Sequence, residues 1–317
     1  MTTRIARRHV LAAAGASVGA IMPAMTKAET SALLPQSDTE PFGYCLNTST
    51  IRRDGLGIVE KIEIAAKAGF KGIEPWIREI DDFINASGSL ADLAKRIRDA
   101  GLRVESAIGF AEWIVDDDAR RAKGLEEAKR NMDLVARIGG TRLAAPPAGA
   151  TDQSDLDLHK AGQRYRELLE LGDRMGIVPQ VEVWGFSKAL RRLSEAMYVA
   201  IESGHSKACV LADIYHLYKG NSPIGGLHLV RGAAMHVIHV NDYPAAPPRD
   251  QITDAHRVYP GDGVAPLAMI FRTLREIGFR GMLSLELFNR DYWKQDALSV
   301  ARLGLEKTRT AVRRSLA

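Results

Sequence analysis

The chain has 317 residues, of which 46% are hydrophobic and 26% are charged. This composition excludes an intrinsically disordered chain or a fibre, and the length allows one α/β barrel or two smaller domains. The formal net charge is +4 at pH 7, from 43 basic and 39 acidic residues.

The first 28 residues have the features of an export signal. Basic residues, among them Arg4 and the pair in "RRHVL" (7–11), precede an Ala- and Gly-rich apolar segment over 10–22, and small residues follow near Ala28. The segment is too short and too weakly apolar to span a membrane. The paired arginines are similar to those of a twin-arginine signal, although arginines in an ordinary signal also fall side by side by chance.

Removal of residues 1–28 changes what the charge implies. These residues hold four basic side chains and no acidic one, so the remaining chain has 39 of each and no net charge. A nucleic-acid partner therefore loses its main electrostatic support. We expect a flexible mature N-terminus over 29–40 and a single folded domain over 41–317. The mature protein is expected to be soluble, periplasmic or secreted by the twin-arginine pathway, with no membrane anchor left.

From about residue 41 onward, short β-type runs alternate with longer amphipathic segments. The predicted strands are "FGYCLN" (42–47), "KGIEPW" (71–76), "LRVESAI" (102–108), "TRLAAP" (141–146), "VPQVEVW" (178–184), "ACVLAD" (208–213), "MHVIHVN" (235–241) and "GMLSLELF" (281–288). Between them, apolar residues recur at three- and four-residue spacing, as in "LADLAKRIRDAG", which indicates helices. Several of these segments end in Gly, as in "KAGF" and "RMGI", which is typical of the position just past a helix.

Eight successive β-then-α units, each of roughly 30 to 35 residues, predict a single (β/α)₈ TIM barrel of the α/β class. An open doubly wound sheet is the alternative. It usually has a Gly-rich phosphate loop after its first strand, and "CLNTSTIRRDGLG" (45–57) is not such a loop. The long, Pro-rich segment over 244–263 is a candidate loop to cover the site.

The two cysteines, Cys45 and Cys209, lie in apolar runs far apart in the sequence. We expect two buried thiols, and a disulfide in an oxidising compartment is the less favoured alternative. The chain has no cysteine cluster for zinc or an iron–sulfur centre.

Polar side chains occur where four successive predicted strands end. Glu182, Asp213, His239 and Glu286 each follow apolar residues at the ends of the fifth to eighth strands. A single acid there is usually a cap or an ion-pair partner, but carboxylates gathered at one barrel mouth repel each other and need a cation. Three carboxylates and one imidazole suit Mn²⁺, with Mg²⁺ or Co²⁺ next. The sequence therefore predicts one divalent metal ion at this mouth.

These strand-end residues resemble those of the xylose isomerase-like barrel superfamily of sugar isomerases and epimerases, which includes ketose 3-epimerases and inosose-processing enzymes. The resemblance runs from about residue 42 to residue 315. It implies one metal ion held by Glu182, Asp213, His239 and Glu286. It also implies that Glu182 and Glu286 are catalytic, since the equivalent glutamates exchange a proton on opposite faces of the substrate.

The expected chemistry is proton transfer next to a carbonyl group. A metal ion polarises a sugar carbonyl and the adjacent hydroxyl, lowers the pKa of the C–H between them and stabilises the enediolate. One carboxylate removes this proton as a general base. Return of the proton from the opposite face inverts the centre, and return to the neighbouring carbon interconverts an aldose and a ketose. Glu182 and Glu286 end strands on opposite sides of the mouth, as two-face chemistry needs.

Further residues are expected to bind the substrate. The resemblance implies this role for His216 in "DIYH" and for Arg257 in "HRVYPGDG". Glu74 in "IEPWI" either lines the pocket or packs in the core. Trp113 and Trp184 either stack on a sugar face or contribute to packing.

The chain departs from the family pattern around these residues. Ketose 3-epimerases usually carry another acid six residues after the fifth-strand glutamate, where this chain has Lys188, and "HVNDYP" (239–244) also differs from many relatives. The identity of the sugar therefore stays open. Because phosphorylated sugars are kept in the cytoplasm, an exported relative is expected to act on an unphosphorylated sugar or glycoside.

Three other functions remain to be weighed against an isomerase or epimerase. A 3-keto-glycoside lyase, the close second, would use the same metal and base to remove the C2 proton and expel the C1 substituent. A non-catalytic periplasmic sugar-binding barrel would bind metal without exchanging protons. The endonuclease branch of the fold is disfavoured, because it needs several zinc ions, many His ligands and a basic groove, whereas the chain has eight His in all. A small-molecule sugar or glycoside is the expected partner, and a homodimer is left open.

Overall fold

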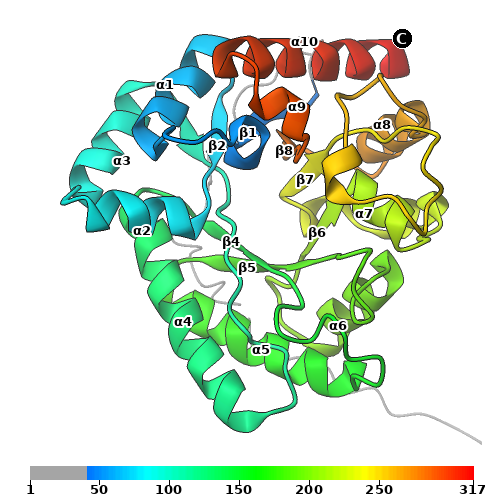
Figure 1. Ribbon diagram of the computed structural model, residues 1–317. Helices are drawn as coiled ribbons and strands as arrows, with labels where there is room; N and C mark the ends of the chain where they lie inside the picture. Colours follow the sequence, from blue (N-terminus) through cyan, green and yellow to red (C-terminus); the bar gives the residue numbers. More distant parts are fainter. Residues whose placement is uncertain (1–40) are drawn as a thin grey trace, which may run out of the picture. The chain divides into compact units, whose positions relative to one another are not determined.

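The computed structural model describes residues 41–317, and the strands of this part form one eight-stranded parallel sheet surrounded by helices (Figure 1). The strands are β1 (Gly43–Asn47), β2 (Gly72–Glu74), β3 (Arg103–Val104), β4 (Arg142–Ala145), β5 (Val178–Glu182), β6 (Val210–Asp213), β7 (Val237–Val240) and β8 (Met282–Leu285). They are ordered β3-β2-β1-β8-β7-β6-β5-β4. Each lies within its predicted range, so the strand prediction is confirmed.

The sheet closes into a barrel between its two outer strands, β3 and β4. Here β3 is only two residues long, but strand-like hydrogen bonding continues beyond it. The Ala107 amide donates to the Arg142 carbonyl at 3.2 Å, and the Ala144 amide donates to the Ala107 carbonyl at 2.9 Å. Closure leaves no free sheet edge, and it excludes the open doubly wound alternative.

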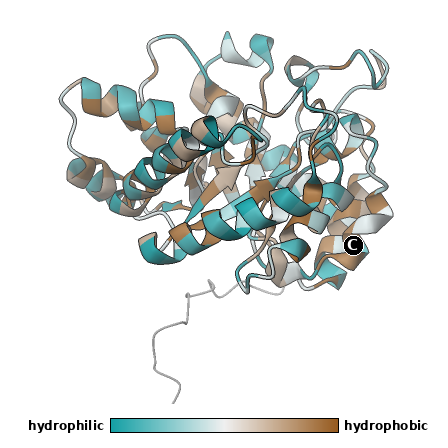
Figure 2. Cartoon of the chain, turned by 90° about the horizontal axis from the view of Figure 1, so that it is seen from below, coloured by the Kyte–Doolittle hydropathy of each residue, from teal (hydrophilic) through white to brown (hydrophobic). Residues whose placement is uncertain are grey.

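Ten α-helices lie in the described part of the chain. They are α1 (Ile58–Ala68), α2 (Ile77–Asn85), α3 (Leu90–Asp99), α4 (Asp118–Arg137), α5 (Leu158–Met175), α6 (Leu193–Glu202), α7 (Ile214–Lys219), α8 (Leu267–Glu276), α9 (Arg290–Trp293) and α10 (Ala297–Leu316). Figure 2 shows hydrophobic residues concentrated in the central strands, while hydrophobic and hydrophilic residues alternate along the helices. None of the helices within residues 41–317 is both long and apolar enough to cross a membrane.

Glycine ends two of these helices as the sequence predicts. Gly69 after α1 and Gly176 after α5 have φ values of 100° and 70°, the left-handed region in which a side chain is strained. The amide of Gly69 donates to the carbonyls of Ala65 and Ala66, so the helix end is also satisfied by hydrogen bonds. These caps turn the chain back toward the barrel and into the next strand.

Both cysteines are buried free thiols, so the expectation of no disulfide is confirmed. Cys45 belongs to a small apolar cluster inside the barrel, and Cys209 lies against the Tyr165 hydroxyl. The expected signal (1–28) and mature N-terminus (29–40) lie outside the described residues, and that division of the chain stays a prediction.

Candidate metal centre and active site

The site lies above a layer of apolar side chains inside the barrel. This layer consists of Cys45, Ile108, Ala144, Leu211, Val237 and Met282. Successive side chains of a strand point to opposite faces, so residues two or four positions further on point into the barrel again. Asp213, His239 and Glu286 occupy these positions on β6, on β7 and just past β8. The polar group therefore lies at the carboxyl ends of the strands.

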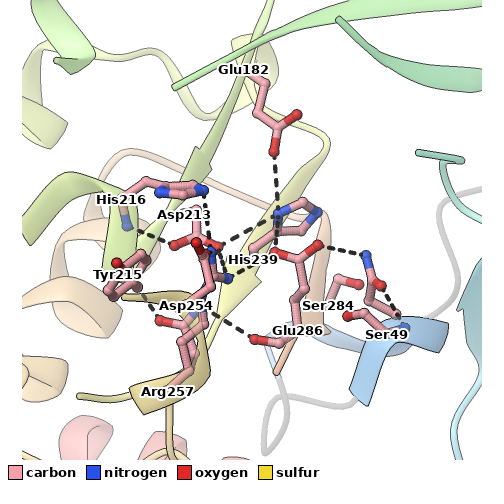
Figure 3. A network of polar contacts seen from close by, with 12 residues as sticks. Ser49, Glu182, Asp213, Tyr215, His216, His239, Asp254, Arg257, Ser284 and Glu286 are labelled. Atoms are coloured by element: carbon pink, nitrogen blue, oxygen red, sulfur yellow. Dashed lines mark hydrogen bonds and ion pairs between the residues drawn. The ribbon is translucent and has the colours of Figure 1, made fainter. Parts of the chain in front are cut away.

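Three of these side chains form a buried metal-binding triad. One ligand atom each from Asp213, His239 and Glu286 lies within 4.8 Å of the others. The exposed fractions of Asp213, His239 and Glu286 are 0%, 0% and 4%, so all three side chains are shielded from bulk water. Figure 3 shows them together with Glu182, whose carboxylate points toward His239 from another side.

The His239 ring is held so that one nitrogen faces the carboxylates. Its Nε2 lies 3.0 Å from Glu74 Oε2, a carboxylate that accepts the Nε2 proton. Its Nδ1 lies 3.1 Å from Glu286, 3.6 Å from Asp213 and 3.8 Å from Glu182, without a well-formed hydrogen bond to any of them. A buried ring nitrogen that faces three carboxylates fits a divalent cation, which satisfies all four groups at once.

Glu182 lies beside the triad rather than within it. Burial raises the pKa of Glu182 to about 8, and the negative charges of Glu286 and Asp213 add to this effect while His239 opposes it. Its Oε2 is buried and has no hydrogen-bond partner. The chemistry of this donor set therefore fits a cation that Glu182 would share with the triad, and it leaves one carboxylate oxygen able to take a proton.

Arg257 is the buried cation of the site. Its Nη1 donates to Asp213 Oδ2 and to Glu286 Oε2, both at 2.8 Å, and its Nη2 lies 3.1 Å from His216 Nε2. Nη2 also donates to Asp254, which lies in the same loop. The segment over 244–263 thus brings a guanidinium from a long loop into the mouth of the barrel, as the sequence led us to expect.

His216 is fixed by the first turn of α7. Its amide donates to Asp213 Oδ1 at 2.8 Å, so Asp213 caps the helix with one oxygen and faces the triad with the other. Burial lowers the pKa of His216 to about 4, and the charge of Arg257 contributes to this shift. The ring is therefore neutral at neutral pH, and its Nε2 accepts from Arg257.

Glu74 and Trp113, for which the sequence left substrate contact and packing open, are both enclosed by other residues. Glu74 is fully buried behind His239, and its Oε2 accepts hydrogen bonds from Asn47 and Ser284 as well. Trp113 is 1% exposed, and its indole Nε1 donates to the Pro146 carbonyl at 2.8 Å. These contacts fit the packing alternative for both residues, and substrate contact by either one stays a prediction.

Further polar residues hold the site together. Asn47 donates to Glu74 and to Glu286, each at 3.0 Å, and so connects the carboxylates on the two strands that flank β1. Asn241 donates to Asp213 Oδ2 at 3.1 Å. Asn241 follows His239 by two residues, so strand alternation alone would have placed it on the same face.

An aromatic arc, defined here as Phe288, Trp76, Phe110, Trp184 and Phe186, runs along this end of the barrel. Successive ring centroids lie 5.9, 5.3, 5.9 and 5.1 Å apart in that order. Phe110 and Phe186 remain 39% and 48% exposed. Trp184, a predicted stacking residue, is thus part of a larger apolar surface that can contact the flat face of a sugar or another ring.

Comparison with known proteins gives a consistent result. The family described as Xylose isomerase-like TIM barrel matches residues 62–311. The chain is 25% identical over 274 residues to an inosose isomerase of Bacillus velezensis, covering 84% of this chain and 96% of that protein. It is 24% identical over 245 residues to the 3-dehydro-D-guloside 4-epimerase of Escherichia coli K12, covering 72% of this chain and 86% of that protein.

Solved structures agree with the fold. The IOLI protein with a bound zinc atom has a TM-score of 0.80 at 21% identity, covering 86% of this chain and 98% of that one. An L-ribulose 3-epimerase has a TM-score of 0.71 at 18% identity, covering 86% and 95%. With a match over most of the described barrel, the chain belongs to the xylose isomerase-like TIM barrel family.

Proposed function

We propose that this protein is a divalent-metal-dependent isomerase or epimerase of an unphosphorylated sugar. The observation that carries the proposal is the set of buried carboxylates around His239 Nδ1, at 3.1 to 3.8 Å, at the carboxyl ends of the barrel strands. Relatives named as an inosose isomerase and a 3-dehydro-D-guloside 4-epimerase support this class of reaction. Export, predicted from residues 1–28, supports a periplasmic or secreted enzyme and an unphosphorylated substrate.

One divalent ion would be held by Glu182, Asp213, His239 and Glu286. Three carboxylates and one imidazole favour Mn²⁺, with Mg²⁺ or Co²⁺ as alternatives. When bound, the ion would polarise a sugar carbonyl and its neighbouring hydroxyl and so acidify the C–H between them. Glu74 would keep the Nε2 proton of His239 and thereby keep Nδ1 available as a ligand.

The proton transfer would be carried out by the two glutamates. Glu182 ends β5 and Glu286 follows β8, so β6 and β7, which carry Asp213 and His239, lie between them. Glu182 Oε2 has no hydrogen-bond partner and is the free atom for accepting or returning the proton. Removal by one glutamate and return by the other, from opposite faces, would invert the carbon. His216 and Arg257 would orient the sugar oxygens.

A 3-keto-glycoside lyase is the second candidate, favoured by the exposed rings of the aromatic arc. Phe110 and Phe186 offer apolar surface at the mouth for a group linked to the reacting sugar. A base would take the C2 proton, a C1–C2 double bond would form, and the C1–O bond would break with the leaving group taking up a proton. A 3-dehydroshikimate dehydratase of Pseudomonas aeruginosa is 25% identical to this chain, covering 73% of this chain and 36% of that protein. Its name describes an elimination reaction.

Deuterium exchange tests these candidates. Mature protein loaded with Mn²⁺ is incubated in D₂O with free ketoses and with 3-keto-glucosides, and the sugars are followed by NMR. Deuterium should enter an intact sugar and should fail to do so in Glu182→Gln and in Glu286→Gln, whereas Glu105→Gln, a buried acid bonded to Arg103, should retain exchange. Release of the aglycone would select the lyase. Metal binding without any exchange would instead favour a non-catalytic sugar-binding barrel.

A further inference from the structure

A cavity of about 680 Å³ is lined by residues that follow β5 and by the last residue of α7. It is bounded by the segment after β5, by the end of α7 and by the loop near residue 249. The lining residues that decide its chemistry are Phe186, Lys188, Arg191, Lys219, Arg249 and Asp250. Four of these six side chains are cationic and one is acidic, so the cavity carries an excess of positive charge.

Most of this positive charge has no ion-pair partner in the described part of the chain. Within residues 41–317, no carboxylate forms an ion pair with Arg191, Lys219 or Arg249, and Lys188 lies 4.0 Å from an acid that is 99% exposed. Lys219 is held in place, because its Nζ donates to three backbone carbonyls of the 249–252 segment at 2.8 to 3.0 Å. Elsewhere many surface cations are paired, as Arg120 is with Glu112 at 2.7 Å.

The cavity and the metal centre share a wall. The Phe186 ring lines the cavity and lies 5.6 Å from the His216 ring, which in turn contacts Arg257 at 3.1 Å. Gly185 brings the two walls together, since a Cβ there would lie 2.3 Å from the His216 carbonyl oxygen. Phe186 and His216 thus form the layer of side chains between the cavity and the metal centre.

We propose that this cavity binds a carboxylate carried by the substrate outside its reacting carbons. The inference rests on the proposed function, because it describes a second part of the same substrate. Guanidinium groups match the geometry of such anions through paired N–H donors. Unneutralised cations in a hollow also raise the local concentration of an anionic substrate. The substrate class is then an acidic sugar derivative rather than a neutral monosaccharide.

Three sugars with one common ring test this proposal by calorimetry on the Mn²⁺-loaded mature protein. They are D-glucose, D-glucuronate and D-glucose 6-phosphate, which differ only in the group at C6. We expect glucuronate to bind about tenfold more tightly than glucose, the size of one charge-assisted hydrogen bond. A preference for the phosphate ester alone would overturn the carboxylate assignment and would also contradict the unphosphorylated substrate proposed above.

Variants of the lining arginines test whether the cavity causes the preference for a charged sugar. The double variant Arg191→Gln/Arg249→Gln should remove it, while Lys129→Gln, which removes an exposed cation of α4, should keep it. Equal binding of all three sugars, or a preference that survives in the double variant, would overturn the proposal. The readout does not need turnover. A protein that keeps the preference but shows no deuterium exchange would lose the proposed base chemistry and keep the anion cavity.

Discussion

Arg257 is a fully buried cation placed between two buried carboxylates, and this arrangement makes its removal costly in the metal-free protein. Its Nη1 lies 2.8 Å from both Asp213 and Glu286. Arg257→Met would remove a charge partner that both buried carboxylates share, and loss of such a partner costs about 3–5 kcal/mol in comparable cases. We expect the free energy of unfolding in urea to fall by this order in the presence of a chelator.

Excess Mn²⁺ should restore much of the stability that Arg257→Met loses, since a bound cation neutralises the same carboxylates. Arg120→Met is the matched control, because it removes a half-exposed ion pair with Glu112 and should change stability by less than about 1 kcal/mol. An equal loss in Arg257→Met with and without metal would mean that no cation binds among these carboxylates.

Glu74 is the second residue whose role can be isolated. It accepts from His239 Nε2 at 3.0 Å and has no exposed surface. Glu74→Gln weakens the hold on the ring and its tautomer, and loss of such a partner typically lowers metal affinity by about 10–100-fold. Mn²⁺ titration of the variant measures this directly.

Glu105→Gln serves as the control for the Glu74 variant, because Glu105 is also buried but bonds to Arg103 rather than to His239. Its Mn²⁺ affinity should match that of the parent protein. If Glu74 instead contacted the substrate, Glu74→Gln would raise KM and leave metal affinity unchanged.

The two tryptophans and Glu74 show where residue-level reading of the sequence succeeds and fails. Asp213 and His239 are found from sequence because they follow apolar strand residues, a local pattern. Glu74 follows the same pattern, but only the three-dimensional arrangement shows that its carboxylate lies behind His239. Trp113 and Trp184 have similar local sequences, yet one is 1% exposed and the other is part of the aromatic arc. Exposure depends on the loops that fold over them, which periodicity does not reveal.

At the scale of elements, the strands were predictable because they are short apolar runs, several of which follow a helix that ends in glycine. The least regular element is β3, where two residues are assigned to the strand and the ring is closed by Ala107. The sequence "LRVESAI" alternates weakly in polarity, so its length could not be read from periodicity. The irregular segment after it carries Phe110, a residue of the aromatic arc.

The contact between the β5 segment and α7 provides an element-scale prediction. Gly185 has no room for a side chain, because an added Cβ would lie 2.3 Å from the His216 carbonyl oxygen and 2.6 Å from the Gly220 amide nitrogen. Gly185→Ala should therefore push α7 away from β5 and cost about 1–3 kcal/mol of unfolding free energy. Because α7 carries His216, substrate binding should weaken as well.

Gly225→Ala is the matched control for Gly185→Ala, since a Cβ at Gly225 would meet no atom within 4 Å. Its urea midpoint should stay close to that of the parent protein. A Gly185→Ala protein as stable as the Gly225→Ala protein would show that the β5 segment and α7 are not packed as tightly as described.

At the scale of the whole described chain, eight repeated units made the barrel predictable. The residues that gather at its mouth could be predicted only in part. Metal ligands come from regular strand ends, whereas Arg257 comes from a loop whose length gives no position in space. The cationic cavity is assembled from three separate segments, each with charges that look unremarkable in sequence. Long-range contacts of this kind follow from closure of the barrel rather than from any local pattern.

Acid should weaken the folded barrel partly through His236, which lies just before β7. Burial lowers its pKa to about 4, and the positive charge of Arg142 adds to the shift. The unfolded chain, with a histidine pKa of about 6.5, takes up a proton that the folded chain does not accept until about pH 4. Stability contributed by the neutral ring is therefore complete above about pH 6.5 and is lost as the pH falls toward 4, by roughly 2–3 kcal/mol.

His236→Gln removes this proton uptake, so the variant should lose less unfolding free energy than the parent protein between about pH 6.5 and pH 4. The difference between the two proteins isolates His236, because carboxylates of the site titrate in both. Parallel curves for the parent and His236→Gln would mean that His236 is protonated in the folded barrel as readily as in the unfolded chain.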